Sequence, residues 1–276
     1  MLDPFDYKEP GCPLSDGKKF YYPSPDDPKG TVPVRRIIEK LDSYFAVNDT
    51  RGAGDFLRHW EAEAQELGDR RGEITIQSEL MGYYRKEGLE TEAMEAVRRG
   101  LYLIEAEKIA DTVPAATVML NAATVYKTFG RPSEALELYE KASAIYSREL
   151  SDDDPLVAGL YNNSALALCD LGRYEEAENL FVQAAAIMSL SDDGGCDEAA
   201  TYVNMADMYE AWRGADDPAI AECLDSAWEI LDSDGIKKDS YYAFVASKCA
   251  PSYEHFGQSE KAKILAERSK KIYEGT

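Results

Sequence analysis

The stretch NAATVYKTFGRPSEALELYEKA, residues 121–142, decides the fold because it reads as two short amphipathic helices. The tripeptide GRP at residues 130–132 separates them and is a turn signal. Small residues stand where helices usually carry bulky ones, and small side chains let two helices approach closely. We therefore expect a tight antiparallel hairpin that packs on four alanines: Ala122, Ala123, Ala135 and Ala142.

The same pattern recurs along the chain at a fixed period. The turn glycines Gly88, Gly130 and Gly172 are 42 residues apart. Alanines five residues later, at positions 93, 135 and 177, keep this spacing. Two less regular copies follow and one degenerate copy precedes them. A single hairpin cannot bury its apolar face alone, so this period predicts hairpins that stack on one another.

The repeated pattern resembles the tetratricopeptide repeat (TPR) over roughly residues 33–275. Its order is a small residue, an aromatic residue, a glycine turn, and then alanine, aromatic and alanine. A period of 42 exceeds the usual length of about 34 residues by roughly one turn per helix. The longer form is most similar to the repeats of kinesin light chain and of bacterial peptide receptors. The third full copy matches at Ala165, Gly172, Tyr174, Ala177, Phe181 and Ala184.

We therefore expect an all-α fold, a TPR-like right-handed α-solenoid of about six helical hairpins. The expected TPR domain spans residues 33–276. Residues 1–32 form a separate arm, because residues 1–30 hold six of the twelve prolines together with Phe20, Tyr21 and Tyr22. Such a segment cannot sustain a helix, and we expect it to lie extended against the helices. The approximate repeats are 33–72, 73–115, 116–157, 158–198, 199–241 and 242–276.

The composition favours a cytoplasmic protein. Of its 276 residues 45% are hydrophobic, which allows a sizeable core, yet no apolar run approaches the 18 residues of a membrane span. The first ten residues lack the features of a secretory signal. The five cysteines are odd in number and form no CxxC pair, which is typical of reduced thiols.

The net charge of −22 is unevenly distributed. Residues 151–235 contain 20 acidic residues and only two basic ones, Arg173 and Arg213, a local charge of −18. These carboxylates either keep the protein soluble or attract a basic partner. Nucleic-acid binding is disfavoured, because phosphates are bound by lysine and arginine.

Four positions on the first helices of the repeats are candidates for ligand binding. A residue two positions before a packing alanine lies about 200° round the helix from it, and so faces away from the partner helix. We expect these residues to line the concave groove. The alanines and the residues two positions earlier are Ala123 with Asn121, Ala165 with Asn163, Ala206 with Asn204, and Ala250 with Lys248.

Other residues share this predicted face. Thr124, Leu166 and Asp207 each follow one of the asparagines by three positions, and Lys127 lies near the expected edge of the groove. An amide has an acceptor and two donors, so a ladder of asparagines can bind an extended peptide backbone. The resemblance implies this role, because asparagines at this register contact peptides in the families named. The alternative is that the asparagines bond an adjacent helix and set the stacking. We expect accessible amide groups.

The sequence predicts a binding protein and not an enzyme. The only histidines, His59 and His255, lie in no metal-binding motif, and the chain has no phosphate-binding or nucleophile-elbow signature. We expect no cofactor and no metal. The chain is then an adaptor that captures an extended peptide or a partner protein in the groove. The alternative is an assembly scaffold or homo-oligomer, such as a homodimer, that acts through its convex or end surfaces.

Overall fold

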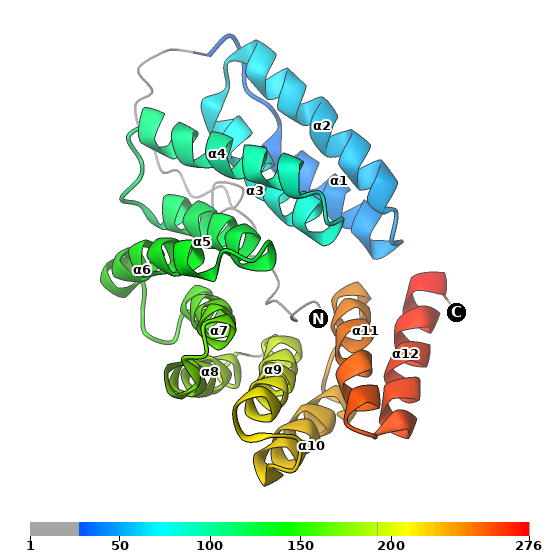
Figure 1. Ribbon diagram of the computed structural model, residues 1–276. Coiled ribbons are helices and arrows are strands. Elements are labelled where there is room, and N and C mark those ends of the chain that lie inside the picture. The colour runs from blue at the N-terminus through cyan, green and yellow to red at the C-terminus, as the bar shows by residue number, and fades with distance from the viewer. Residues whose placement is uncertain (1–27, 192, 276) are drawn as a thin grey trace. The chain divides into compact units, whose positions relative to one another are not determined.

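The computed structural model describes residues 28–191 and 193–275. These residues form twelve helices and no strand, and consecutive helices pair as six antiparallel hairpins (Figure 1). The expected all-α TPR-like fold of six hairpins is confirmed. The helices are α1 (Val34–Ala46), α2 (Thr50–Leu67), α3 (Arg70–Lys86), α4 (Glu90–Ala106), α5 (Val113–Thr128), α6 (Pro132–Glu149), α7 (Pro155–Asp170), α8 (Tyr174–Met188), α9 (Gly195–Arg213), α10 (Pro218–Asp232), α11 (Ser240–His255) and α12 (Ser259–Glu274).

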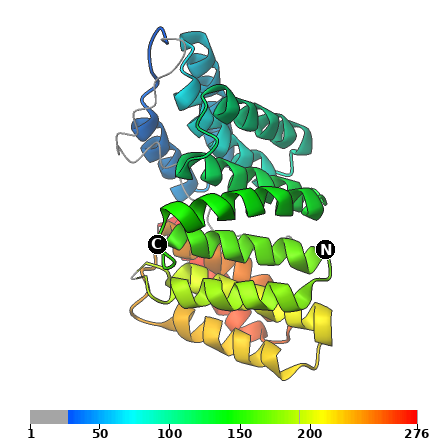
Figure 2. The same ribbon diagram turned by 90° about the vertical axis from the view of Figure 1, so that its left-hand side faces the viewer.

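The hairpins fall into two compact units of three. The N-terminal unit contains α1–α6 and ends at Ser151, and the C-terminal unit begins at Asp152 and contains α7–α12. Within each unit the two helices of a hairpin lie side by side in both views (Figures 1 and 2). From the second repeat on, each expected repeat boundary lies two to four residues inside the first helix of its hairpin.

In the second, third and fourth hairpins, a glycine in a left-handed conformation ends the first helix. Gly88, Gly130 and Gly172 have φ values of 71°, 77° and 70°. A side chain is disfavoured at such angles, which explains why glycine recurs there. In the α5–α6 turn the Gly130 amide donates to the Lys127 carbonyl and the Arg131 amide to the Tyr126 carbonyl, which satisfies the last carbonyls of α5.

The alanines of the repeat lie in the hairpin cores. Ala123 on α5 and both Ala135 and Ala142 on α6 are fully buried. In the C-terminal unit, Ala158 on α7 and Ala184 on α8 belong to one apolar cluster with Met188. These positions agree with the expectation that small side chains allow the two helices of a hairpin to approach closely.

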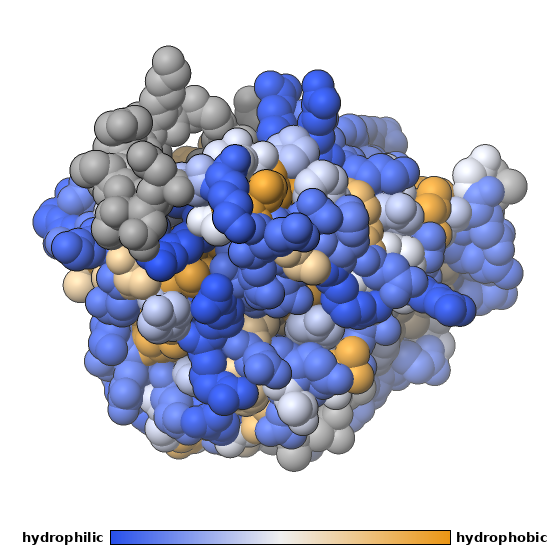
Figure 3. All heavy atoms as spheres, turned by 90° about the horizontal axis from the view of Figure 1, so that it is seen from above, coloured by the Kyte–Doolittle hydropathy of each residue, from blue (hydrophilic) through white to orange (hydrophobic). Residues whose placement is uncertain are grey.

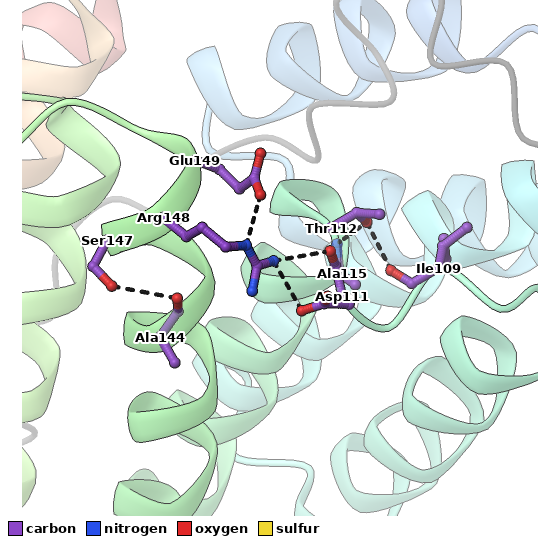
Figure 4. A network of polar contacts seen from close by, with 8 residues as sticks. All are labelled: Ile109, Asp111, Thr112, Ala115, Ala144, Ser147, Arg148 and Glu149. Atoms are coloured by element: carbon purple, nitrogen blue, oxygen red, sulfur yellow. Dashed lines mark hydrogen bonds and ion pairs between the residues drawn. The ribbon is translucent and has the colours of Figure 1, made fainter.

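Polar contacts join successive hairpins at their ends. At the end of α6, the Arg148 guanidinium donates to the Asp111 carboxylate at 2.9 Å and to Glu149 at 2.7 Å (Figure 4). Asp111 lies in the connection between α4 and α5, directly before the Thr112 cap of α5. The contact therefore ties the second and third hairpins together.

The residues that lead into α1 are held by α2 and α3. The Lys29 amide donates to the Leu67 carbonyl at 2.8 Å, and the Val32 amide donates to the Asp69 carboxylate at 2.8 Å. The expectation that an arm docks through Phe20, Tyr21 and Tyr22 concerns residues outside the described ones. Across the helices that the structure describes, none combines the length and apolar character needed to cross a membrane.

Candidate functional site

In the N-terminal unit, the Asn121 amide is oriented by the preceding hairpin. Asn121 lies on α5, and its Nδ2 donates to Ser78 Oγ on α3 at 2.8 Å. Its Oδ1 is buried and has no hydrogen-bond partner among the described residues. The side chain thus joins two successive first helices through its NH₂ group and leaves its carbonyl oxygen unbonded.

The threonines near Asn121 face their own hairpin. Thr124 Oγ1 lies 3.0 Å from Tyr139 Oη of α6, and Thr117 Oγ1 lies 2.8 Å from Tyr146 Oη of the same helix. We predicted Thr124 on the groove face, but a residue three positions on lies about 60° away from Asn121. This offset turns the Thr124 hydroxyl toward α6. Lys127, expected at the groove edge, is buried.

In the C-terminal unit, a chain of amides joins α9 to α7. Asn204 Nδ2 on α9 donates to Asn162 Oδ1 on α7 at 3.1 Å, and Thr201 Oγ1 contacts the same oxygen at 3.2 Å. Asn162 Nδ2 in turn donates to Asn163 Oδ1 at 3.3 Å. The Asn163 Nδ2 is buried without a partner among the described residues. We call Asn204, Asn162 and Asn163 the amide relay.

The expectation of accessible amide groups is wrong. Asn121, Asn163 and Asn204 are exposed by only 2%, 1% and 2%. The predicted direction, away from the partner helix, leads to the neighbouring first helix, which packs against Asn121 and Asn204. Two of the three asparagines therefore make the interhelical bonds of the alternative interpretation. Whether any of them also contacts a peptide stays a prediction.

The other residues that we predicted to line the groove differ in solvent exposure. Leu166 is buried, Asp207 is half-buried on α9, and Lys248 on α11 is exposed. Ser252 of α11 donates to Asp207 Oδ2 at 3.3 Å. Burial raises the pKa of the Asp207 carboxyl to about 6, and the nearby charge of Glu210 adds to the rise. Asp207 is thus a carboxylate whose ionised form is disfavoured.

A cavity of about 880 Å³ lies beside α9 and α10 in the C-terminal unit. Its walls include an ammonium group, Lys237, which pairs with Asp239 at 3.0 Å. Tyr241 Oη donates to the Asp197 carboxylate, and burial raises the pKa of Glu198. Such a lining favours a cationic ligand over an anionic one. The carboxylates in the wall are Asp193, Asp197, Glu198, Glu229 and Asp239.

The surface offers few large apolar side chains. The exposed ones include Tyr102 on α4, Val182 on α8, and Val47 and Leu190, which lie just after α1 and α8. The face shown in Figure 3 is mainly hydrophilic, with hydrophobic residues scattered among charged ones. Isolated apolar residues of this kind are normal and do not mark a binding site.

Two of the described cysteines, Cys223 and Cys249, lie in surroundings that disfavour the reactive thiolate. Cys169, Cys196, Cys223 and Cys249 form no disulfide. Burial raises the pKa of the Cys223 thiol to about 12 and that of Cys249 still further above its ordinary value. Because the thiolate is the nucleophilic form, neither thiol suits nucleophilic chemistry at neutral pH.

The stacked hairpins place the chain in the class of helical-repeat proteins. Comparison with known protein families identifies the type of repeat. Two models of the tetratricopeptide repeat match residues 115–156 and 156–222. Residues 115–222 therefore consist of tetratricopeptide repeats. The comparison with curated protein sequences finds no match.

Solved structures share this fold. A kinesin light chain-like protein of Podosopora anserina with nearly identical TPR-like repeats is 23% identical, with a TM-score of 0.50. That match covers 71% of this chain and 92% of the other. A Rap protein complexed with competence and sporulation factor is 13% identical and covers 89% of this chain and 66% of the other, with a TM-score of 0.55. At these identities the likeness shows the fold alone.

Two residues that orient the predicted asparagines were missed from the sequence. Ser78 bonds Asn121, and Asn162 stands between Asn204 and Asn163. The 42-residue spacing of Asn162 and Asn204 was the available signal for the second of these contacts. Ser78 carried no comparable signal, since serine is common on helices and its partner lies 43 residues away.

Proposed function

We propose that the chain is a non-catalytic adaptor that binds an extended peptide segment of a partner protein along its first helices. In a TPR solenoid these helices line the concave groove. The observation that carries the proposal is that α5 and α7 each hold a buried asparagine with one unsatisfied hydrogen-bonding atom, on Asn121 and Asn163. A buried unsatisfied group costs about 1–3 kcal/mol. Each residue of a peptide backbone carries one donor and one acceptor, so a peptide bound to either unit of the chain would satisfy the atom in that unit.

The predicted residues have different roles in this proposal. Asn121 and Asn163 contact the ligand backbone, and Asp207 and Lys248 contact its side chains. Asn204, Thr124, Leu166 and Lys127 shape and support the face, because the structure buries them. Asn121 and Asn163 are themselves covered, so binding requires that the atoms above them move aside. The Rap protein, which shares the fold, was solved with a bound factor, and this supports ligand capture by such hairpins.

We further propose that the partner segment is basic. Residues 151–235 carry a net charge of −18, and the cavity beside α9 and α10 has five carboxylates in its wall against one lysine. Lysine or arginine side chains of the ligand would relieve this repulsion. Affinity should then fall as salt is added, because exposed charges are screened. We also propose a reducing compartment, the cytoplasm, because Cys223 and Cys249 form no disulfide.

A peptide selection tests the proposal. A phage-displayed library of random 12-residue peptides is selected on the full chain, and the enriched peptides are synthesised and titrated by calorimetry. We expect Asn121→Ala and Asn163→Ala each to weaken binding by about 2- to 13-fold, the worth of one hydrogen bond. Asn179→Ala is the matched control, since Asn179 is exposed on α8.

Failure to enrich any peptide, or equal affinity of all three variants, contradicts peptide capture by these helices. Light scattering on the same samples tests the alternative. A chain that forms a stable homo-oligomer and selects no peptide is an assembly scaffold that acts through other surfaces.

A further inference from the structure

We propose that the contact between α9 and α11 is a pH-sensitive latch. Its open form, in which α11 has moved away from α9, becomes more populated as the pH rises from about 5 to 8. The latch lies wholly within the C-terminal unit and joins the fifth hairpin to the sixth. It goes beyond the proposed binding function and does not depend on it.

Three carboxylates of α9 form the acceptor side of the latch, and each is bonded by a side chain of α11. The three pairs are Asp197 with Tyr241, Asp207 with Ser252 at 3.3 Å, and Glu210 with His255 at 2.8 Å. The donors are a phenol, a hydroxyl and an imidazole, and of these only the imidazole can carry a positive charge. Histidine is also the side chain that ordinarily changes its charge between about pH 5 and 8. The strength of the contact between Glu210 and His255 therefore depends on pH.

The Asp207 carboxylate is half-buried with little to compensate its charge. Burial raises its pKa to about 6, and the charge of Glu210, one turn further along α9, adds to the rise. Ser252 donates one neutral hydrogen bond, and His255 also opposes the rise. The thiol of Cys249 on α11 lies near Asp207, and burial raises the pKa of this thiol, so it stays neutral. The ionised form of Asp207 is therefore disfavoured while the latch is closed.

Charged groups on the helices packed against α9 are engaged in other contacts. They are Lys248 of α11, which lies over the Phe244 ring, Glu178 of α8, which accepts from Tyr209, and Asp225 of α10, which pairs with Lys261. On α7, the residues three and four positions after Asn162 are the apolar Ala165 and Leu166. Among the described residues, Glu210 and His255 are consequently the charged neighbours that act on Asp207.

The two titrations act in the same direction. In mildly acidic solution the imidazole is charged and pairs with Glu210, while Asp207 is neutral. At higher pH the imidazole is neutral, and two ionised carboxylates stand one turn apart on α9. The closed form thus binds more protons than the open form and loses stability as the pH rises. With Asp207 at its ordinary pKa of 3.8 in the open form, the ratio of open to closed molecules rises about 10-fold between pH 5 and 7.

The sixth hairpin has a second set of contacts, with α10, and no histidine takes part in them. They are Tyr253 with the Leu224 carbonyl, Tyr242 with the Leu231 carbonyl, Lys261 with Asp225, and Arg268 with Asp232. Phenol hydroxyls and ion pairs of these types ordinarily keep their protonation state over this pH range. A rise in pH therefore weakens the contact with α9 and leaves the contacts with α10 in place.

Two native thiols report the opening of the latch. Cys249 of α11 is fully buried near Asp207, whereas Cys223 of α10 is buried near Glu178 of α8. The folded full chain is treated with N-ethylmaleimide at pH 5, 6, 7 and 8, and mass spectrometry of its peptides gives the labelling rate of each cysteine. Each rate is divided by that of the urea-unfolded chain at the same pH, which removes the pH dependence of the thiol itself. The ratio for Cys249 should rise at least about 10-fold between pH 5 and 7, and that for Cys223 by less than about 3-fold.

Three variants test the cause of the rise. Asp207→Asn keeps an acceptor for Ser252 and removes the ionisable group, so the rise for Cys249 should shrink by about 10-fold. His255→Lys keeps a positive charge beside Glu210 at every pH, and the ratio for Cys249 at pH 8 should fall at least about 3-fold below that of the parent chain. Asp225→Asn is the control, because it removes a carboxylate from the contacts with α12 and should leave the rise unchanged.

The outcomes separate the latch from general unfolding. A ratio for Cys249 that stays constant from pH 5 to 8 would overturn the latch. An equal rise for Cys223 would also contradict it, because the whole unit would then be unfolding. So would a rise that persists unchanged in Asp207→Asn, because this carboxylate would then not be the titrating group. The thiol measurements involve no peptide, so their failure is distinct from a failure of the proposed function.

Discussion

At the scale of single residues, the repeat depends on small side chains at the hairpin crossings. Ala184 of α8 is fully buried against Ala158 of α7, whereas Ala186 on the same helix is exposed. Both are alanines in one helix, so they differ mainly in the room around their side chains.

We expect Ala184→Leu to lower the free energy of unfolding by about 1–3 kcal/mol, because added methyl groups overpack a tight crossing. Ala186→Leu is the control and should change it little, since leucine and alanine have similar helix propensities. Urea unfolding followed by circular dichroism measures both. Equal stability of the two variants would show that the contact between α7 and α8 can accommodate a larger side chain at position 184.

Asp207 makes the stability depend on pH in an unusual direction. Its pKa rises from 3.8 to about 6 in the folded chain, chiefly through burial, with Glu210 adding to the rise and Ser252 and His255 opposing it. Between these values the folded state binds more protons than the unfolded state, so the contribution of Asp207 becomes less favourable as the pH rises from about 4 to 6.

We therefore expect Asp207→Asn to stabilise the chain at pH 7 by roughly 2–3 kcal/mol, from about 1.4 kcal/mol for each unit of pKa shift. The gain should vanish below pH 4, where the carboxyl is neutral in both states. Melting curves of the variant and the parent from pH 4 to 8 measure the difference. Asp216→Asn, at an exposed position, is the control. A difference that grows toward low pH would contradict the assignment.

At the scale of elements, the turn glycines are the strongest local signal. Gly172 has φ of +70°, and the space that a side chain would occupy there is open, so only the backbone conformation requires glycine at this position. Gly235, before α11, lacks a positive φ.

We expect Gly172→Ala to cost about 1–2 kcal/mol, the penalty of a left-handed conformation for an L-residue. Gly235→Ala should be neutral or stabilise by up to about 1 kcal/mol, because it restricts the unfolded chain. Urea titrations of both variants measure the free energy of unfolding. They show whether glycine is required at position 172 for its left-handed conformation or only adds flexibility to the chain. If the Gly172 variant matched the parent, the turn would have to tolerate another conformation.

The elements were predictable from sequence because their determinants are local. The spacing of Gly88, Gly130 and Gly172 and the alanines that follow each turn are enough to predict hairpins of the observed kind. The environment of Asn121 was not predictable, since it depends on Ser78, 43 residues away on another hairpin. Likewise the 42-residue spacing from Gly130 to Gly172 continues across residue 151 and gives no sign of the division into two units.

At the scale of the whole molecule, charge is the dominant property. A net charge of −22 disfavours the compact state through self-repulsion. Salt screens this repulsion, with a Debye length of about 30 Å at 0.01 M and about 8 Å at 0.15 M.

The melting temperature should accordingly rise when sodium chloride is increased from about 10 to 150 mM, over the range in which the Debye length shortens most. Choline chloride at the same ionic strength is the control and should give the same rise, because screening does not depend on the cation. Differential scanning calorimetry measures both series. A fall in melting temperature with salt would show that ion pairs outweigh the repulsion.

The bond between Asn204 and Asn162 has a consequence for how such a chain changes length. The two asparagines stand 42 residues apart, and counted from the turn glycines Gly172 and Gly214 they hold the same position in successive hairpins. The donor and the acceptor of this hydrogen bond are both asparagine side chains. A hairpin duplicated by unequal recombination would therefore already carry the asparagine that the bond needs. No matching surface would need to evolve separately. Gain or loss of a whole hairpin is therefore a smaller step for this architecture than an insertion of a few residues within one.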